Sequence, residues 1–309
     1  MNPSGNRWRA LLACLTPALC LALGCDGGAH VPDAQTQPAS YSSELSVRFE
    51  VSPDRATSVS VLGFRAAAAG PEIDVLGLVD PLAAAAPDQG CVLRDVDLAN
   101  RALATRGSSV DLEELGGVGV GLGAAATPST VIRTFPRVYP DVAGVVGGVV
   151  GEAAAQPITA LPERVSILSP DSELPVAELS VPALPKLLAI NGSAPTAGLR
   201  VDTTNGLSVS LAGAGGSFIE LRPFGTTVVV SCAVPSNAST ESIVSVPRAL
   251  LAHLRAPDST GVAAGNQGTV GISLEIARRV RAREPLATPT SGTRVSVEVR
   301  SALAVELRP

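Results

Sequence analysis

The end of the chain carries the strongest folding signal in the sequence. From Val295 to Leu307 every odd position is apolar except Ser301, whereas the even positions include Glu298 and Arg300. Successive side chains of a β-strand point to opposite faces, so this alternation predicts one long strand. We expect its odd face to lie against a core and its charged face to point away from that core.

The same two-residue period recurs along the chain. Apolar residues alternate with polar ones over 45–51, which predicts a half-buried strand, and again over 207–211 and 270–276. Frequent glycine and proline residues separate these segments. Only Pro247 to Leu254 has a helical pattern, with the proline at its first turn. The expected fold class is therefore all-β.

The first 25 residues have the pattern of an export signal. Arg7 and Arg9 precede an apolar run over 10–23. This run has 14 residues, fewer than the roughly 20 that a membrane-spanning helix needs. A basic start, a short apolar core and small residues before a cleavage point are typical of a secretory signal peptide, so we expect residues 1–24 to be removed.

The segment Leu21-Ala22-Leu23-Gly24-Cys25 resembles the lipobox of bacterial lipoproteins. It departs from the family pattern at Ala22, where a leucine is usual. The resemblance implies that Cys25 is acylated and becomes the mature N-terminus, with a membrane as partner through the lipid. Two or three acyl chains anchor a protein stably. The alternative is an ordinary signal peptide with an incidental cysteine, and the choice between outer and inner membrane stays open.

Three regions follow the signal. Residues 25–43 are rich in Gly, Pro and polar residues, which is typical of a flexible tether. Residues 44–195 form a predicted β-rich domain. The Asn-Gly and Pro residues of 190–198 favour a boundary there, and residues 199–309 form a second predicted domain.

The short strands and turn signals of residues 199–309 resemble an immunoglobulin-like or fibronectin-like antiparallel β-sandwich. The whole chain is similar to exported bacterial lipoproteins that carry such domains. The Cys-Trp-Cys core of true immunoglobulin domains is missing. The resemblance implies a sandwich built without that marker.

Composition excludes several functions. The net charge of −5 becomes −7 when Arg7 and Arg9 leave with the signal, so nucleic acid is not an expected partner. The one Trp, Trp8, also lies in the signal, which argues against an aromatic carbohydrate platform.

Catalytic and metal-binding patterns are missing as well. The two histidines are His30 in the tether and His253 in the predicted helix, so a zinc site or a catalytic triad has too few histidines. The glycine series at 116–123 lacks the spacing of a dinucleotide-binding loop and predicts a turn between strands. No catalytic residue, metal or cofactor is predicted.

Two cysteines remain after Cys25. Cys91 and Cys232 lie one in each predicted domain, in apolar strands. In an oxidising compartment they form either a disulfide that clamps the two regions together or a pair of buried free thiols.

One basic cluster stands out near the end of the strand that begins at Val270. If that strand continues, then Arg279, Arg281 and Arg283 share one face, where they contact an anionic polymer or an acidic partner. The alternative is a solvated edge that resists aggregation.

These patterns together predict a non-catalytic, lipid-anchored structural or protein-interaction module of the cell envelope, with an envelope protein as its partner. The alternatives are a secreted hydrolase whose carboxylates the sequence does not locate, and an adhesin or ligand-binding module.

Overall fold

The structure is a computed structural model that describes residues 41–52, 55–68, 77, 79, 87–95, 110–123, 130–142, 146–168, 175–213, 215–224, 226, 228–234, 241–254, 269–284 and 293–308. All of these residues belong to one compact unit, Ala39–Pro309. The predicted signal peptide, Cys25 and the tether up to residue 40 lie outside the described residues. Strands dominate the described chain, so the all-β prediction is confirmed.

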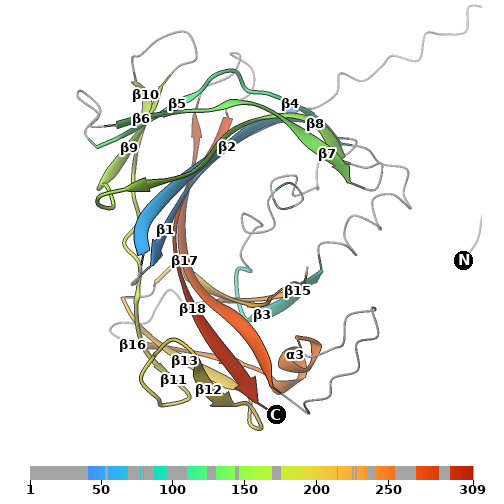
Figure 1. Cartoon of the computed structure of the whole chain (residues 1–309), viewed down its shortest axis with the longest axis vertical. Helices are drawn as coiled ribbons and strands as arrows, with labels where there is room; N and C mark the ends of the chain where they lie inside the picture. The colour runs from blue at the N-terminus through green and yellow to red at the C-terminus, as the bar shows by residue number, and fades with distance from the viewer. Residues whose placement is uncertain are drawn as a thin grey trace, which may run out of the picture. The chain divides into compact units, whose positions relative to one another are not determined.

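In the described part of the chain, eleven strands form one long sheet. These strands are β1 (Tyr41–Ser52), β2 (Arg55–Ala68), β3 (Cys91–Asp95), β4 (Val110–Glu113), β7 (Phe135–Val142), β8 (Val146–Ile158), β12 (Leu199–Asp202), β14 (Ser217–Pro223), β15 (Val228–Ala233), β17 (Val270–Glu284) and β18 (Thr293–Arg308). Their order is β3-β15-β14-β17-β18-β1-β2-β4-β8-β7, with β12 beside β18 (Figure 1). None of the sheets is closed.

Two smaller sheets and a short helix complete the described fold. Their elements are β5 (Gly119–Leu122), β6 (Thr130–Arg133), β9 (Arg164–Leu168) and β10 (Pro175–Ser180) in a four-stranded sheet, β11 (Lys186–Ile190), β13 (Leu207–Ala212) and β16 (Glu241–Val246) in a three-stranded sheet, and the helix α3 (Arg248–His253). The helix follows Pro247 and lies within the range predicted for it.

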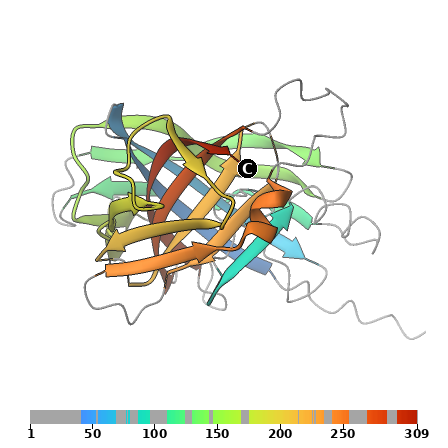
Figure 2. The same cartoon turned by 90° about the horizontal axis from the view of Figure 1, so that it is seen from below.

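Both small sheets pack against the same face of the long sheet. Val297 of β18 is fully buried in a core shared with the four-stranded sheet, including Val120 and Ile167. Leu307 of β18 is fully buried in a second core shared with Val209 of the three-stranded sheet. Because both β18 residues are odd-numbered, they point to one side of the strand. Figure 2, seen from below, shows yellow strands in front of the red strand β18.

The long strand at the end of the chain forms as predicted. β18 spans Thr293–Arg308, and its odd positions from Val295 to Val299 are fully buried. It pairs with β17 in the antiparallel sense but with β1 and β12 in the parallel sense, so the sheet is mixed rather than wholly antiparallel. β1 and β18 lie too far apart in the chain to form a hairpin. Parallel pairing sets Val47 opposite Val297, which aligns their apolar faces.

Strands from both sides of the predicted boundary at 190–198 belong to the long sheet. β1, β2, β3, β4, β7 and β8 precede the boundary, and β12, β14, β15, β17 and β18 come from the region 199–309. The two regions meet twice in that sheet, at the parallel pairing of β1 with β18 and at the antiparallel pairing of β3 with β15.

The prediction of a turn for the glycine series is wrong in part. Gly119–Leu122 is the buried strand β5, which lies between β6 and β9. A Cβ atom on Gly119 would lie 3.2 Å from the Leu168 side chain of β9. Glycine is therefore used here for close packing rather than for chain reversal.

Candidate functional site

The charged face of β18 points away from the two apolar cores, and it is itself buried around Glu298 and Arg300. Glu298 and Arg300 are 1% and 3% exposed. The neighbouring strands supply further charges to the same face of the long sheet. We call this group the charged cluster; it consists of Arg48, Glu220, Arg222, Glu275, Arg279, Glu298 and Arg300.

Strand register brings these seven side chains together. Glu298 of β18 lies opposite Arg48 of β1 on one side and opposite Arg279 of β17 on the other. One strand further, Glu275 of β17 lies opposite Glu220 of β14. Because side chains alternate between faces, strands in this register present these seven charges on the side away from the two apolar cores.

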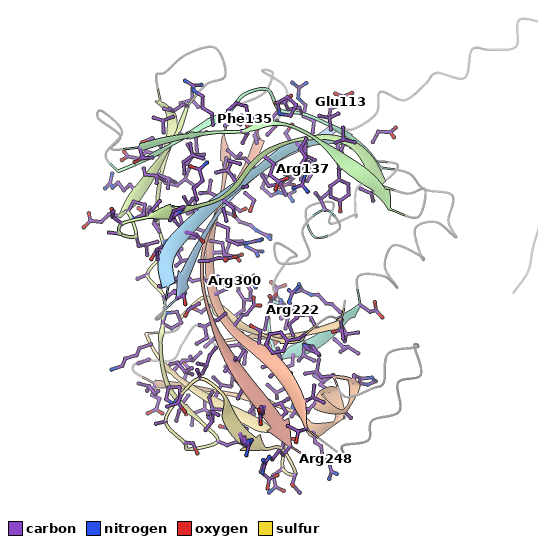
Figure 3. The ribbon with its side chains drawn as sticks, in the orientation of Figure 1. Glu113, Phe135, Arg137, Arg222, Arg248 and Arg300 are labelled. Atoms are coloured by element: carbon purple, nitrogen blue, oxygen red, sulfur yellow. A yellow bond between two sulfur atoms is a disulfide. The ribbon has the colours of Figure 1, made fainter. Side chains whose placement is uncertain are left out.

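Arg300 holds the centre of the charged cluster. Its Nη1 donates to Glu220 Oε2 at 2.7 Å and also contacts Glu275 Oε2, while its Nε donates to Glu298 Oε1 at 2.8 Å. Its Nη2 lies 2.7 Å from the same Glu298 oxygen. Each nitrogen of this guanidinium therefore contacts a glutamate. Figure 3 shows Arg300 and Arg222 on the same side of the sheet.

Glu298 is the second centre of the cluster. Its Oε2 accepts a hydrogen bond from Arg279 Nε at 2.5 Å, and its Oε1 lies 3.6 Å from Arg48 Nε. The guanidinium of Arg279 also lies over the ring of Phe218, 5.3 Å from the ring centroid. Such a cation–π contact contributes about 2 kcal/mol when it is desolvated.

The pKa values of the two central residues, Glu298 and Arg300, are shifted in opposite directions. Burial alone would raise the pKa of the Glu298 carboxyl, but the nearby charges of Arg300, Arg279 and Arg48 outweigh it and hold the pKa below its ordinary value. Burial alone would lower the pKa of Arg300, yet the three glutamates hold that pKa well above its ordinary value. Both groups therefore remain charged at neutral pH.

These shifts indicate what the cluster does chemically. A general acid needs a carboxyl whose pKa is raised toward neutrality. Glu298 is shifted the other way, and Glu220 and Glu275 are both bonded to Arg300. The cluster has the character of a rigid ionic core rather than an acid–base pair.

A groove adjoins the charged cluster. It has a volume of about 700 Å³ and runs between the ends of β1 and β2 and the middle of β17 and β18. Glu50, Glu275 and Arg300 are its charged lining residues, and Phe224, 65% exposed, also lines it. This volume lies in the range of small-molecule binding sites. A smaller groove of about 320 Å³ is lined by Arg48 of β1 and by residues of β2, β7 and β8.

Cys91 and Cys232 are joined in a disulfide. They face each other on the neighbouring strands β3 and β15, with Cα atoms 4.0 Å apart. The bond closes a loop across a sequence separation of 141 residues. A crosslink over so long a loop restricts the unfolded chain and stabilises the fold by about 2–5 kcal/mol. It fastens β3, the terminal strand in the order of the long sheet.

The predicted arginine face of β17 is divided by the structure. β17 continues to Glu284 and pairs with β18 along its whole length, but with β14 only up to Arg278. Arg279 is directed to Glu298 within the charged cluster, whereas Arg281 is exposed. The side chain of Arg283 lies outside the described residues.

Three further expectations concern histidine, metals and membranes. His253 is exposed on α3. Among the described residues, no cluster of three or more His, Cys, Asp or Glu side chains is placed to bind a metal ion. Within the same residues, no helix has the length and hydrophobicity of a membrane span.

The chain was compared with protein-family models, curated proteins and solved structures, and none of them matches.

Sequence reasoning missed the charged cluster. A signal was present: Glu220 with Arg222, Glu275 with Arg279, and Glu298 with Arg300 each follow the two-residue period of their strands. Opposite charges at matching positions on several strands suit a buried network as well as they suit a solvated face. Only the pairing of the strands distinguishes the two.

Proposed function

We propose that this protein is a non-catalytic, lipid-anchored interaction module of the cell envelope. Its first 24 residues direct export, acyl chains on Cys25 hold it to a membrane, and the β-rich part binds an envelope partner. The anchor is supported by the basic start, the short apolar run and the segment Leu21–Cys25.

The observation that carries the interaction role is the groove of about 700 Å³ beside the charged cluster. Arg300 connects the two, because it lines the groove and is bonded to Glu220, Glu275 and Glu298. Binding sites gain affinity when their walls are preorganised. A groove whose floor includes Arg300, a guanidinium held by three glutamates, has such a wall.

The proposal includes an immunoglobulin-like or fibronectin-like character for residues 199–309. It is supported by the packing of Val209 and Val244 of the three-stranded sheet against Ile219 and Leu274 of the long sheet, as in two facing sheets.

A secreted hydrolase is the second candidate, because Glu50 and Glu275 both line the groove. We rank it behind binding because Glu275 is committed to an ion pair with Arg300. If the protein hydrolysed ester or glycoside substrates and Glu50→Gln abolished that turnover, the hydrolase would replace the binding module.

Labelled palmitate tests the anchor. We expect its incorporation into the full-length protein, and loss of both label and membrane association in Cys25→Ser. Cys14→Ser is the matched control and is expected to keep both. Membrane association that persists in Cys25→Ser would contradict the anchor.

A further inference from the structure

We propose that the groove of about 700 Å³ binds a primary ammonium or guanidinium group carried on a slender aliphatic stem. This inference rests on the proposed binding role and names the chemistry of its ligand.

Arg300 is the cation that lines the groove. All three of its nitrogens contact glutamates, and its side chain is 3% exposed. An incoming anion would have to compete with carboxylates that are already bonded and buried. Arg300 is therefore not an anion-binding group for this groove.

Glu50 is a carboxylate that lines the groove. This residue lies opposite Arg300 in the register of β1 and β18, and its side chain is exposed. Arg300 is bonded to three other glutamates, and Glu50 makes no ion pair with a described residue. Glu275 Oε1 lies 3.8 Å from Arg222 Nε, beyond hydrogen-bond distance. Hydroxyls of Ser58 and Ser273 also line the groove, but the charge that is exposed there is the carboxylate of Glu50, which suits a cation.

The floor of the groove is built from small side chains. Ala302 and Ala304 of β18 line the groove and are exposed, so the floor beside Arg300 is formed by methyl groups. Ser58 lies opposite Glu50 on β2 and also lines the groove. A thin methylene chain fits over such a floor and buries apolar surface on it, as the stem of lysine does in proteins.

Phe224 is the aromatic residue among those that line the groove. Its ring lines the same groove and is 65% exposed, which is unusual for a phenylalanine. Aromatic rings bind ammonium and guanidinium groups through their faces. Carboxylates, a low apolar floor and an aromatic ring together select a cation with an aliphatic stem over an anion or a rigid ring system.

The experiment uses the full-length protein and two probes that carry the same chemistry, 1,5-diaminopentane and N-acetyl-lysine methylamide. Binding is followed by NMR titration. We expect saturation with one or both probes, and none with N-acetyl-glutamate methylamide or the uncharged N-acetyl-norleucine methylamide. Binding of the diamine alone identifies a free small amine as the ligand; binding of the lysine probe identifies a basic side chain. Equal binding of the glutamate probe would overturn the proposal.

Three variants locate the site. Glu50→Gln is expected to weaken binding at least fivefold, and Ala302→Leu is expected to abolish it by filling the floor. Phe224→Leu is expected to weaken it about twofold to threefold. Glu241→Gln is the matched control, because Glu241 is exposed on β16 away from the groove. Unchanged binding by both Glu50→Gln and Ala302→Leu would overturn the proposal.

Folding of each variant is checked by its thermal unfolding midpoint, since Glu50 and Ala302 are exposed and their substitution should not unfold the chain. The outcome is independent of the anchor. Binding is measured whether or not Cys25 carries lipid, so a failure at the groove leaves palmitate incorporation untouched, and a failure of palmitate incorporation leaves the groove untouched.

Discussion

Around Glu298 and Arg300 both faces of β18 are buried, but they are built from opposite chemistry. On the odd face, Val297 and Leu307 enter two apolar cores. On the even face, Glu298 and Arg300 enter the charged cluster. Apolar burial is favourable wherever it occurs, at roughly 25 cal/mol per Å². Burial of charge is tolerated only where every partner is in place. We therefore call the odd, apolar face of β18 the tolerant face and its even, charged face the exacting face.

The largest effect is expected from breaking the exacting face. Arg300→Ala would leave Glu220, Glu275 and Glu298 close together without their shared cation. Removing one partner of a buried ion pair costs about 3–5 kcal/mol, because the remaining charge is uncompensated. Urea unfolding of the full-length protein measures the loss. A change below about 1 kcal/mol would mean that the cluster does not behave as a buried network.

The tolerant face is tested by Leu307→Ala. Leu307 is fully buried in the core below the three-stranded sheet. Truncating a buried leucine costs about 2–5 kcal/mol through lost transfer energy and the cavity left behind. Unlike the loss in Arg300→Ala, this loss should not vary with salt or pH. A strong dependence on pH would contradict the apolar character of this face.

Acid should lower the contribution of the charged face to the free energy of unfolding, but not the contribution of the apolar face. The pKa of Glu298 is held below its ordinary value in the folded protein, so the unfolded chain binds a proton first as the pH falls. The stabilising contribution is full above the ordinary carboxyl pKa, declines below it, and is lost once the pH passes the folded pKa. Unfolding midpoints measured between pH 7 and pH 3 should show this decline.

Two variants sharpen the acid experiment. Glu298→Gln should be less stable at neutral pH and should show a shallower decline in acid, because its side chain no longer titrates. Leu307→Ala should follow the wild-type decline, displaced downward. An equal acid decline in wild type and Glu298→Gln would assign the effect to other carboxyls.

The smallest effect is expected from an exposed ion pair that joins β12 to β18. Arg200 Nε lies 2.8 Å from Glu306 Oε2, but the two side chains are 63% and 39% exposed. Exposed ion pairs contribute about 0–1 kcal/mol and are screened by salt. Arg200→Ala should therefore change urea unfolding little. A loss close to that of Arg300→Ala would remove the distinction between buried and exposed charge.

Local patterns predicted much of the fold. The alternation over 295–307 predicted β18, the run over 45–51 predicted the middle of β1, and Pro247 predicted the start of α3. Each depends on neighbours in the chain, through backbone geometry that holds everywhere. The local pattern of charges in each strand did not predict the candidate site, because its seven charges are brought together from β1, β14, β17 and β18.

The sequence by itself therefore determined where strands form and which side chains share a face, since that period is a property of the extended backbone. Only the tertiary structure decided what covers each face. It placed β1 parallel to β18, set Arg48 and Arg279 on either side of Glu298, and turned the charged face of β18 into a buried ionic core. The physical reason is that alternation distinguishes two faces, whereas burial depends on strands that are distant in the chain.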